Sequence, residues 1–243
     1  MEGIKMESKK QLLEAVSKSE SDRREYLNAL FKYVPDAIVK TISCKKIKKG
    51  EYIIHEGTPC DMVYIILSGT IVGMDYQKQG RAYYFMDFAQ MHIVGDFEVF
   101  GDIPEYCISI CAAEECEILM LSAKYYSQWV QHDENALLLR IKNIMAMLTF
   151  EKKNEREYMF MNCKERLIKY LIKSYENKKH KNTGIYKIEK TQLELSDRIG
   201  FNIRSVQRNI AALEKEKLIC IENGKITISK EQFLRLKQYE ENK

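Results

Sequence analysis

Proline and glycine are scarce in this sequence, with 3 Pro and 11 Gly among 243 residues. That scarcity excludes a collagen-like chain and a long flexible linker, so regular secondary structure should make up most of the protein. Long hydrophobic runs are also missing. No stretch approaches the ~20 apolar residues of a membrane helix, and the charged N-terminus lacks the apolar core of a signal peptide. We expect a soluble, cytoplasmic protein.

Cysteine is present without the pattern of a disulfide framework. The 7 Cys are odd in number and irregularly spaced in a chain of 243 residues. That length allows one large or two modest domains, each able to bury a core without disulfide or metal support. Reduced thiols in a reducing compartment are therefore expected.

Charge is divided unevenly along the chain. The whole sequence has 39 Lys and Arg against 35 Asp and Glu, a formal charge of +4. From Cys163 onward there are 19 basic and 11 acidic residues, a charge of +8, while the preceding part has 20 and 24, a charge of −4. A basic segment beside a slightly acidic one is typical of a protein in which one domain binds a polyanion. A solvated lysine-rich surface would give the same counts, so only a binding motif can distinguish the two interpretations.

Hydrophobic patterning predicts three parts. In residues 1–133, a loose helical pattern over 1–32 precedes short β-branched and aromatic runs over 41–121, typical of a β-sandwich or barrel. Residues 134–161 form a long helix whose apolar positions follow the spacing of a dimer seam. These positions are Leu138, Ile141, Met145 and Leu148. Such a helix would be about 40 Å long, too long for its own β-domain to cover, so we expect a homodimer. Packing of part of the helix on its own barrel is the alternative.

Residues 162–243 carry local signals of a winged helix-turn-helix. Asn162 and Glu165 fit a capping box, which places a hinge at residues 160–162. Thr191 opens a short helix with a second capping box, Gly200 can end it, and Asn202 can cap the next helix. Asn223 and Gly224 then predict a tight hairpin, the wing.

The second helix of this motif should present polar residues to DNA. Arg204, Ser205 and Arg208 lie opposite its apolar stripe, and a guanidinium can bind guanine O6 and N7 together. Phosphates suit the start of the short helix and the wing. The expected DNA-binding residues are Thr191, Asn202, Arg204, Ser205, Gln207, Arg208 and Lys225.

A family resemblance covers roughly residues 40–230. The strings that carry it are Gly50-Glu51-Tyr52-Ile53-Ile54-His55-Glu56-Gly57, Val63-Tyr64-Ile65-Ile66-Leu67-Ser68-Gly69, Val94-Gly95-Asp96-Phe97-Glu98, Asp197-Arg198-Ile199-Gly200 and Val206-Gln207-Arg208. In their order and spacing the chain resembles the cyclic-AMP receptor protein and fumarate-nitrate regulator (Crp/Fnr) family of bacterial transcription regulators. It looks closest to the YeiL-like branch around Asp87 and over residues 118–126.

The resemblance implies an α+β protein. Its parts would be an N-terminal double-stranded β-helix (jelly-roll) domain of the cyclic-nucleotide-binding kind, a long dimerisation helix and a C-terminal winged helix-turn-helix. The homodimer would bind double-stranded DNA with a two-fold symmetric operator and would contact RNA polymerase. A small-molecule effector would enter the β-roll, shift the long helices and the hinge, and so change the spacing of the recognition helices.

Departures from the family pattern bear on the effector. Where members that bind cyclic AMP have an Arg-Ser pair for the phosphate, this chain has Tyr106 and Cys107, and the ribose-binding Glu is Asp96. A phosphate would lose its main charge-assisted partner, so cyclic-nucleotide binding is not expected. An unidentified ligand or redox signal is the alternative, and so is a constitutive binder whose pocket its own side chains fill. The candidate pocket residues are Phe85, Phe88, Gly95, Asp96, Tyr106, Cys107 and Met145.

Other sensor chemistries leave weaker signals. The first cysteine is Cys44, which excludes the N-terminal cysteine cluster of the iron-sulfur branch. Cys107, Cys111 and Cys116 are either a thiol or metal sensor or small core residues. Haem ligation by His55 or His92 is disfavoured, because lone histidines are usually structural. We predict no resident cofactor and no metal.

The competing function from another class is a cupin-type β-barrel metalloenzyme. That chemistry usually requires a His-X-His pair with further His or Glu ligands. The 4 His of this chain are all more than two residues apart, and neither a Ser-His-Asp nor a phosphate-loop pattern is present. The sequence therefore favours a regulator over an enzyme.

Overall fold

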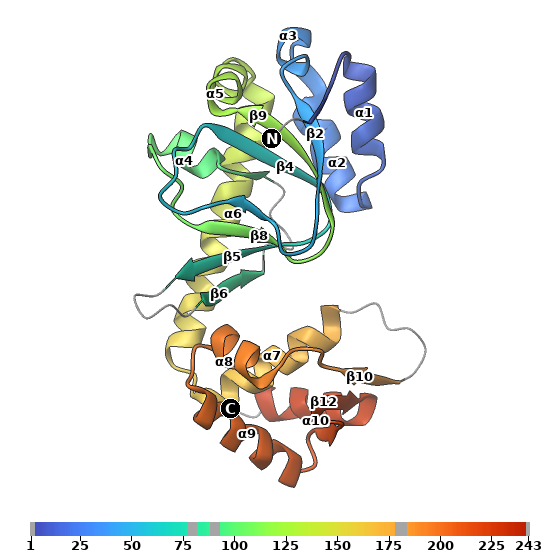
Figure 1. Cartoon of the computed structure of the whole chain (residues 1–243), viewed down its shortest axis with the longest axis vertical. Helices are drawn as coiled ribbons and strands as arrows, with labels where there is room; N and C mark the ends of the chain where they lie inside the picture. Colours follow the sequence, from blue (N-terminus) through green and yellow to red (C-terminus); the bar gives the residue numbers. More distant parts are fainter. Residues whose placement is uncertain (1–2, 77–81, 88–92, 178–183, 242–243) are drawn as a thin grey trace. The chain divides into compact units, whose positions relative to one another are not determined.

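The computed structural model describes residues 3–76, 82–87, 93–177 and 184–241 (Figure 1). Contacts divide the chain into two compact units, Met1–Glu151 and Lys152–Lys243. The division falls inside the long helix α6 (Glu134–Met159), so the boundaries at 133 and 161 stay predictions. Helices and sheets occur together, which confirms the α+β class.

The first unit begins with helices that cover one flank of a β-roll (Figure 1). The helices pack on the roll because successive side chains of a strand point to opposite faces of the sheet. Val63, Ile65 and Leu67 of one strand lie in a core shared with these helices, whereas Ile66 lies in the core inside the roll. The elements, in chain order, are β1 (Ile4–Lys5), α1 (Lys9–Ser17), α2 (Ser21–Leu30), the short 3-10 helix η1 (Phe31–Tyr33), α3 (Asp36–Val39), β2 (Ser43–Ile47), β3 (Tyr52–Ile54), β4 (Met62–Ser68), β5 (Ile71–Tyr76), β6 (Ala82–Asp87), β7 (Ile93–Val94), α4 (Asp96–Phe100), β8 (Ser109–Ala112), β9 (Cys116–Ser122), α5 (Ala123–His132) and α6.

The roll consists of two antiparallel sheets. One has five strands in the order β1-β2-β9-β4-β7, and the other has four in the order β3-β8-β5-β6. Apolar residues of both sheets meet in one interior cluster, Ile118 from the first sheet and Ile110 from the second among them. The expected β-sandwich is thus confirmed. The strands β2 to β9 lie over the predicted region 41–121, with β9 ending at Ser122, whereas β1 lies in the segment 1–32 that was expected to be helical.

The helix α3 lies beyond the helical pattern expected over 1–32, and two further helices of the first unit were not expected either. One is α4, which directly follows Gly95, whose φ is 88°. The helix α5 follows β9 and is capped by Ser122, whose side chain accepts a hydrogen bond from the Tyr125 amide. Both helices come after a strand end, where the apolar pattern alone does not show that the chain turns helical.

The second unit holds a helix-turn-helix and a three-stranded sheet in the order β10-β12-β11. Asn223 and Gly224, both with positive φ, form the tight turn between β11 and β12, as the sequence predicted. The strand β10 and the helix α10 were not predicted. The elements are α7 (Cys163–Asn177), β10 (Ile185–Lys187), α8 (Gln192–Ile199), α9 (Ile203–Lys215), β11 (Cys220–Glu222), β12 (Lys225–Ser229) and α10 (Lys230–Glu241).

Candidate DNA-binding surface and sensor site

The start of α8 is held by a complete capping box. The Glu194 amide donates to the Thr191 hydroxyl at 3.2 Å, and the Thr191 amide donates to the Glu194 carboxylate at 2.7 Å. Gly200 then takes the left-handed conformation that ends α8. Asn202 caps α9, with its side-chain oxygen accepting from the Ser205 amide at 2.9 Å. Both helices of the motif therefore begin where the sequence predicted, and local hydrogen bonds define the turn between them.

The helix α9 has one buried and one exposed face. Val206, Ile210 and Leu213 lie in the core of the second unit. Arg204 and Arg208 are exposed on the opposite side, one helical turn apart. The two guanidiniums are thus free of the protein core and can meet a groove of DNA, which is the arrangement expected of a recognition helix.

Three further predicted DNA contacts have different surroundings. Ser205 is half-buried. The side-chain amide of Gln207 donates to the side-chain oxygen of Gln192 at 3.2 Å, a bridge between α9 and α8. Lys225 at the wing donates to the backbone oxygen of Glu189 at 2.6 Å, so a phosphate would compete with a carbonyl for this ammonium. Thr191 and Asn202 contribute their side chains to the caps described above.

Arg166 is a structural residue of this unit that the sequence did not point to. Its guanidinium donates to the backbone oxygen of Tyr158 at 2.8 Å and to that of Ile199 at 3.2 Å. The same group lies over the rings of Tyr158 and Phe201. It thereby connects the last turn of α6 to the turn of the helix-turn-helix.

The predicted capping box at Asn162 and Glu165 is present. The Asn162 amide donates to the Glu165 carboxylate at 2.7 Å, and the Glu165 amide donates to the side-chain oxygen of Asn162 at 3.1 Å.

In the first unit, the carboxylate of Asp96 points toward the helices α2, α5 and α6. Its Oδ2 atom accepts from Arg140 of α6 at 2.7 Å and from the Tyr126 hydroxyl at 3.1 Å. Arg140 also donates to the Tyr26 hydroxyl of α2 at 2.7 Å. Burial raises the pKa of Asp96, and Arg140 opposes that rise. For Arg140, burial disfavours the charged form, but Asp96, Tyr126 and Tyr26 together outweigh burial and raise its pKa.

The structure brings together only some of the candidate pocket residues. Tyr106 is buried and donates its hydroxyl to the Met62 oxygen at 2.6 Å, and a Cβ on Gly95 would lie 2.6 Å from that oxygen. The backbone amide of Cys107 donates to the buried carboxylate of Glu98 at 3.1 Å.

The remaining candidates lie apart from this group. Asp96 faces Arg140 instead, and Met145 is 54% exposed on α6. Phe88 and the side chain of Phe85 lie outside the described residues.

Cys107, Cys111 and Cys116, interpreted above as either a thiol or metal sensor or small core residues, have different surroundings. Cys111 packs with Val72 in a small cluster, whereas Cys116 lies in the roll interior. Burial raises the pKa of all three thiols, and for Cys107 the carboxylate of Glu98 raises it further. Among the residues that the structure describes, no group of three His, Cys, Asp or Glu side chains could hold a metal ion. The described helices likewise include none that is long and apolar enough to cross a membrane.

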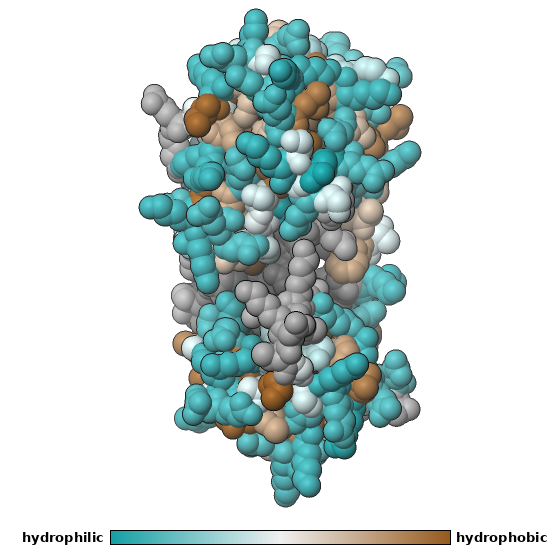
Figure 2. Space-filling view, turned by 90° about the vertical axis from the view of Figure 1, so that its right-hand side faces the viewer, coloured by the Kyte–Doolittle hydropathy of each residue, from teal (hydrophilic) through white to brown (hydrophobic). Residues whose placement is uncertain are grey.

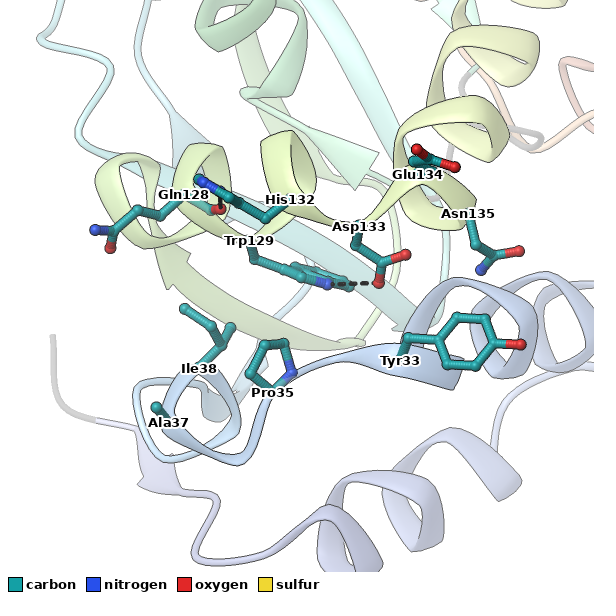
Figure 3. A pocket seen from close by; sticks show the side chains of 10 residues that line it. All are labelled: Tyr33, Pro35, Ala37, Ile38, Gln128, Trp129, His132, Asp133, Glu134 and Asn135. Atoms are coloured by element: carbon teal, nitrogen blue, oxygen red, sulfur yellow. Dashed lines mark hydrogen bonds between the residues drawn. The ribbon is translucent and has the colours of Figure 1, made fainter.

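A cleft of about 670 Å³ lies on another part of the first unit, between the segment from η1 to α3 and the junction of α5 with α6 (Figure 3). Trp129 lies in it with its indole nitrogen donating to the Asp133 carboxylate at 3.0 Å. Asn135 donates to the Ala29 backbone oxygen at 2.7 Å. None of the predicted effector residues that the structure describes lines this cleft.

The long helix α6 carries an exposed apolar stripe. Leu138, Ile141 and Met145 are 56%, 43% and 54% exposed, although Ile144 on the adjoining face is buried. On the face of the molecule shown in Figure 2, hydrophobic residues are scattered singly among hydrophilic ones. Scattered exposure of that kind is ordinary, whereas an ordered row along one helix is the pattern expected of a helix that packs on a partner.

Comparisons with known proteins agree with this geometry. Residues 44–133 match the family described as the cyclic nucleotide-binding domain. The chain is 27% identical over 204 residues to the anaerobic regulatory protein of Bacillus subtilis, covering 82% of this chain and 85% of that one. It is 23% identical over 182 residues to the cAMP-activated global transcriptional regulator CRP of Salmonella typhimurium, covering 72% and 84%. Among solved structures, a transcriptional regulator of the Crp/Fnr family from Eubacterium rectale superimposes with a TM-score of 0.72 at 18% identity, covering 87% and 97%.

Proposed function

This chain belongs to the Crp/Fnr family of transcription regulators, and from that premise we propose that it is a homodimeric, sequence-specific DNA-binding regulator. The winged helix-turn-helix reads an operator of two-fold symmetry. The β-roll no longer binds cyclic nucleotides; either it responds to an unidentified ligand or redox signal, or the protein binds DNA constitutively. We also propose that the protein is cytoplasmic and that it contacts RNA polymerase.

The exposed pair Arg204 and Arg208 carries the DNA-binding proposal. Both project from a helix whose start is capped and whose opposite face is buried, so their backbone positions are well defined. Arginine can form two parallel hydrogen bonds with guanine in the major groove. The basic charge of +8 from Cys163 onward supplies the non-specific attraction to phosphates.

A gel-shift titration of the upstream region of its own gene, at about 50 and about 200 mM salt, tests this function. With six to ten phosphate contacts, affinity should fall by about 10³- to 10⁵-fold between these salt concentrations. Arg208→Ala should weaken specific binding by about 1–3 kcal/mol and relax one base position. Arg235→Ala, which removes an exposed arginine paired with Glu231 on α10, is the matched control. Absence of binding even at low salt contradicts the proposal.

The apolar stripe of α6 supports the homodimer. A row of exposed apolar side chains at seam spacing is suited to the same row of a second copy. Regulators of the Crp/Fnr family bind DNA as dimers, so the similarity to them also leads us to expect a homodimer. Dimerisation would also present two recognition helices to the two halves of a symmetric operator.

The surroundings of Cys107 support the loss of cyclic-nucleotide binding. The buried carboxylate of Glu98 already accepts the Cys107 amide at 3.1 Å. Tyr106, at the family's arginine position, is a buried phenol that donates to a backbone oxygen. A cyclic phosphate would therefore meet the Glu98 carboxylate at the place where family members that bind cyclic AMP have an arginine. The two negative charges would repel each other. Calorimetric titration with cyclic AMP and cyclic GMP should show no binding, and a dissociation constant below the millimolar range contradicts this part.

The nature of the signal divides this proposal into two versions. In one, an unidentified ligand enters the roll; in the other, the protein binds DNA constitutively and its own side chains fill the pocket. The bonds of Tyr106 and Glu98 within the roll favour the second version. Native mass spectrometry of the purified protein distinguishes them, because a retained small molecule would add mass to each protomer.

A further inference from the structure

We propose that Gln207 reads an adenine in the operator and that Gln192 positions its side chain for that contact. The inference rests on the proposed DNA-binding function and adds a specificity-determining pair to it. Its basis is the hydrogen bond of 3.2 Å from the side-chain nitrogen of Gln207 to the side-chain oxygen of Gln192.

The two glutamines join the two helices of the motif at its exposed edge. Gln207 is exposed on α9, directly before Arg208 and three residues after Arg204. Gln192 is half-buried and is the first residue of α8, next to the Thr191 capping box. Because both backbones are held by caps and by the core, the bond restricts the side chain of Gln207 rather than the helices.

The hydrogen bond leaves a specific pattern on the Gln207 amide. A carboxamide has two N–H donors and one oxygen acceptor, and Gln192 takes one donor. One donor and one acceptor then remain side by side. Adenine presents a matching pair in the major groove, the N7 acceptor and the N6 donor, whereas guanine presents two acceptors. The neighbouring Arg204 and Arg208 have donors alone and match guanine, so the three side chains would read different bases.

Holding the amide in advance is the contribution of Gln192. A free glutamine loses rotamer entropy when it is immobilised, and a partner that restricts it beforehand reduces that loss on binding. Because the Gln192 oxygen accepts from the Gln207 nitrogen, it also fixes the orientation of the Gln207 amide, and with it the positions of the free N–H donor and the oxygen acceptor. Gln192 is thus a positioning residue, and Gln207 is the residue that contacts DNA.

Selection of binding sites from a pool of randomised duplex DNA by the full chain tests the pair. The wild-type protein should select an adenine at one position of each half-site, with a preference between about 5-fold and about 150-fold over guanine. Gln207→Ala should lose that preference and keep the preferences at every other position. Gln207→Glu should change the preference to cytosine, because a carboxylate accepts from the cytosine N4 donor.

Variants of Gln192 separate positioning from general structure. Gln192→Ala should weaken the adenine preference alone, and Gln192→Glu should restore it, since a carboxylate still accepts from Gln207. The added negative charge lowers affinity for all sequences equally and leaves the pattern unchanged. Gln131→Ala, at an exposed glutamine of α5 that bonds to Ser127, is the control and should change nothing.

The outcomes distinguish the inference from the function on which it rests. If the wild-type protein selects no sequence and shows no salt-dependent binding, the DNA-binding function fails and the inference fails with it. If the wild-type protein selects a motif that Arg208→Ala relaxes but Gln207→Ala leaves intact, the adenine contact alone is overturned. Replacement of the selected adenine by 7-deazaadenine should lower wild-type affinity and leave Gln207→Ala unaffected; equal losses in both proteins also overturn it.

Discussion

Arg140 and Asp96 form an ion pair whose two side chains are 2% and 3% exposed, with Nη2 of Arg140 2.7 Å from Oδ2 of Asp96. The pair joins the residue after the Gly95 turn of the β-roll to the long helix α6. Tyr26 of α2 accepts a further hydrogen bond from the same guanidinium. Within the first unit, the turn, α2 and α6 are therefore connected through one buried charge, and a displacement of any of them disturbs the other two.

Removing one member of this pair should destabilise the first unit strongly. Arg140→Met or Asp96→Asn leaves a buried polar group without its partner, at a cost of about 3–5 kcal/mol each. The double variant should lose much less than the two single losses together. Urea unfolding followed by the fluorescence of Trp129 measures this, because it is the single tryptophan and lies buried in the same unit.

Tyr26→Phe provides the comparison for the ion pair. It removes one hydrogen bond to Arg140 and should cost about 1 kcal/mol. Strictly additive effects of Arg140→Met and Asp96→Asn would show that the two side chains do not depend on each other.

Charge placed in the apolar stripe of α6 should prevent dimerisation. Met145→Glu puts a carboxylate into a seam that the second copy would cover, where an unpaired charge costs several kcal/mol. The dimer dissociation constant should rise by about 100-fold or more, since each dimer contains two such charges. Sedimentation velocity over a range of concentrations measures it. Ala146→Glu, at an exposed position outside the seam, should leave the dimer intact; equal behaviour of the two variants would place the interface elsewhere.

Arg166→Lys should loosen the turn of the helix-turn-helix without changing which bases are read. A lysine ammonium cannot bridge the backbone oxygens of Tyr158 and Ile199 as the planar guanidinium does. Affinity for the selected operator should fall by about 5- to 30-fold, as expected from a loss of about 1–2 kcal/mol. Fluorescence anisotropy with labelled DNA gives the affinity, and Arg235→Lys is the control. A changed base preference would instead show that Arg166 helps to position the recognition side chains.

Cys107 should react slowly with alkylating reagents despite its exposure. Partial burial and the carboxylate of Glu98 raise its pKa, so at pH 7 to 8 it holds less of the reactive thiolate than a free cysteine. The rate should continue to increase with pH beyond the usual thiol range. Burial raises the pKa of Cys60 to about 11, and that thiol should react more slowly still.

Mass spectrometry after timed exposure to iodoacetamide gives these rates residue by residue. Glu98→Gln keeps the acceptor for the Cys107 amide but removes the charge, so it should accelerate the alkylation of Cys107. A rate for Cys107 above that of free cysteine would revive the thiol-sensor alternative.

Several parts of the helix-turn-helix could be predicted because their signals are local. The capping boxes at Asn162 and Thr191 and the cap at Asn202 each depend on residues three positions apart, so spacing alone reveals them. The tight turn at Asn223 likewise needs only two residues that tolerate positive φ. The seam of α6 repeats along one helix and can be recognised for the same reason.

The sensor site could not be predicted in the same way. Asp96 was expected to face the effector pocket, but the chain turns helical directly after Gly95, and each residue of α4 rotates by about 100° rather than alternating as in a strand. Asp96 thus meets the helices while Glu98 meets the Cys107 amide. Periodicity does not show where a strand pattern gives way to a helix.

The sequence by itself determined the caps and turns of the helix-turn-helix, the start of α9 and the row of apolar residues along α6, since all of these depend on neighbours within a few positions. Only the tertiary structure decided the partners of the buried charges. Arg140 and Asp96 are 44 residues apart in the chain, and neither residue type indicates the other. A buried charge is stable only where folding brings an opposite charge to it, and that meeting depends on the path of the whole β-roll.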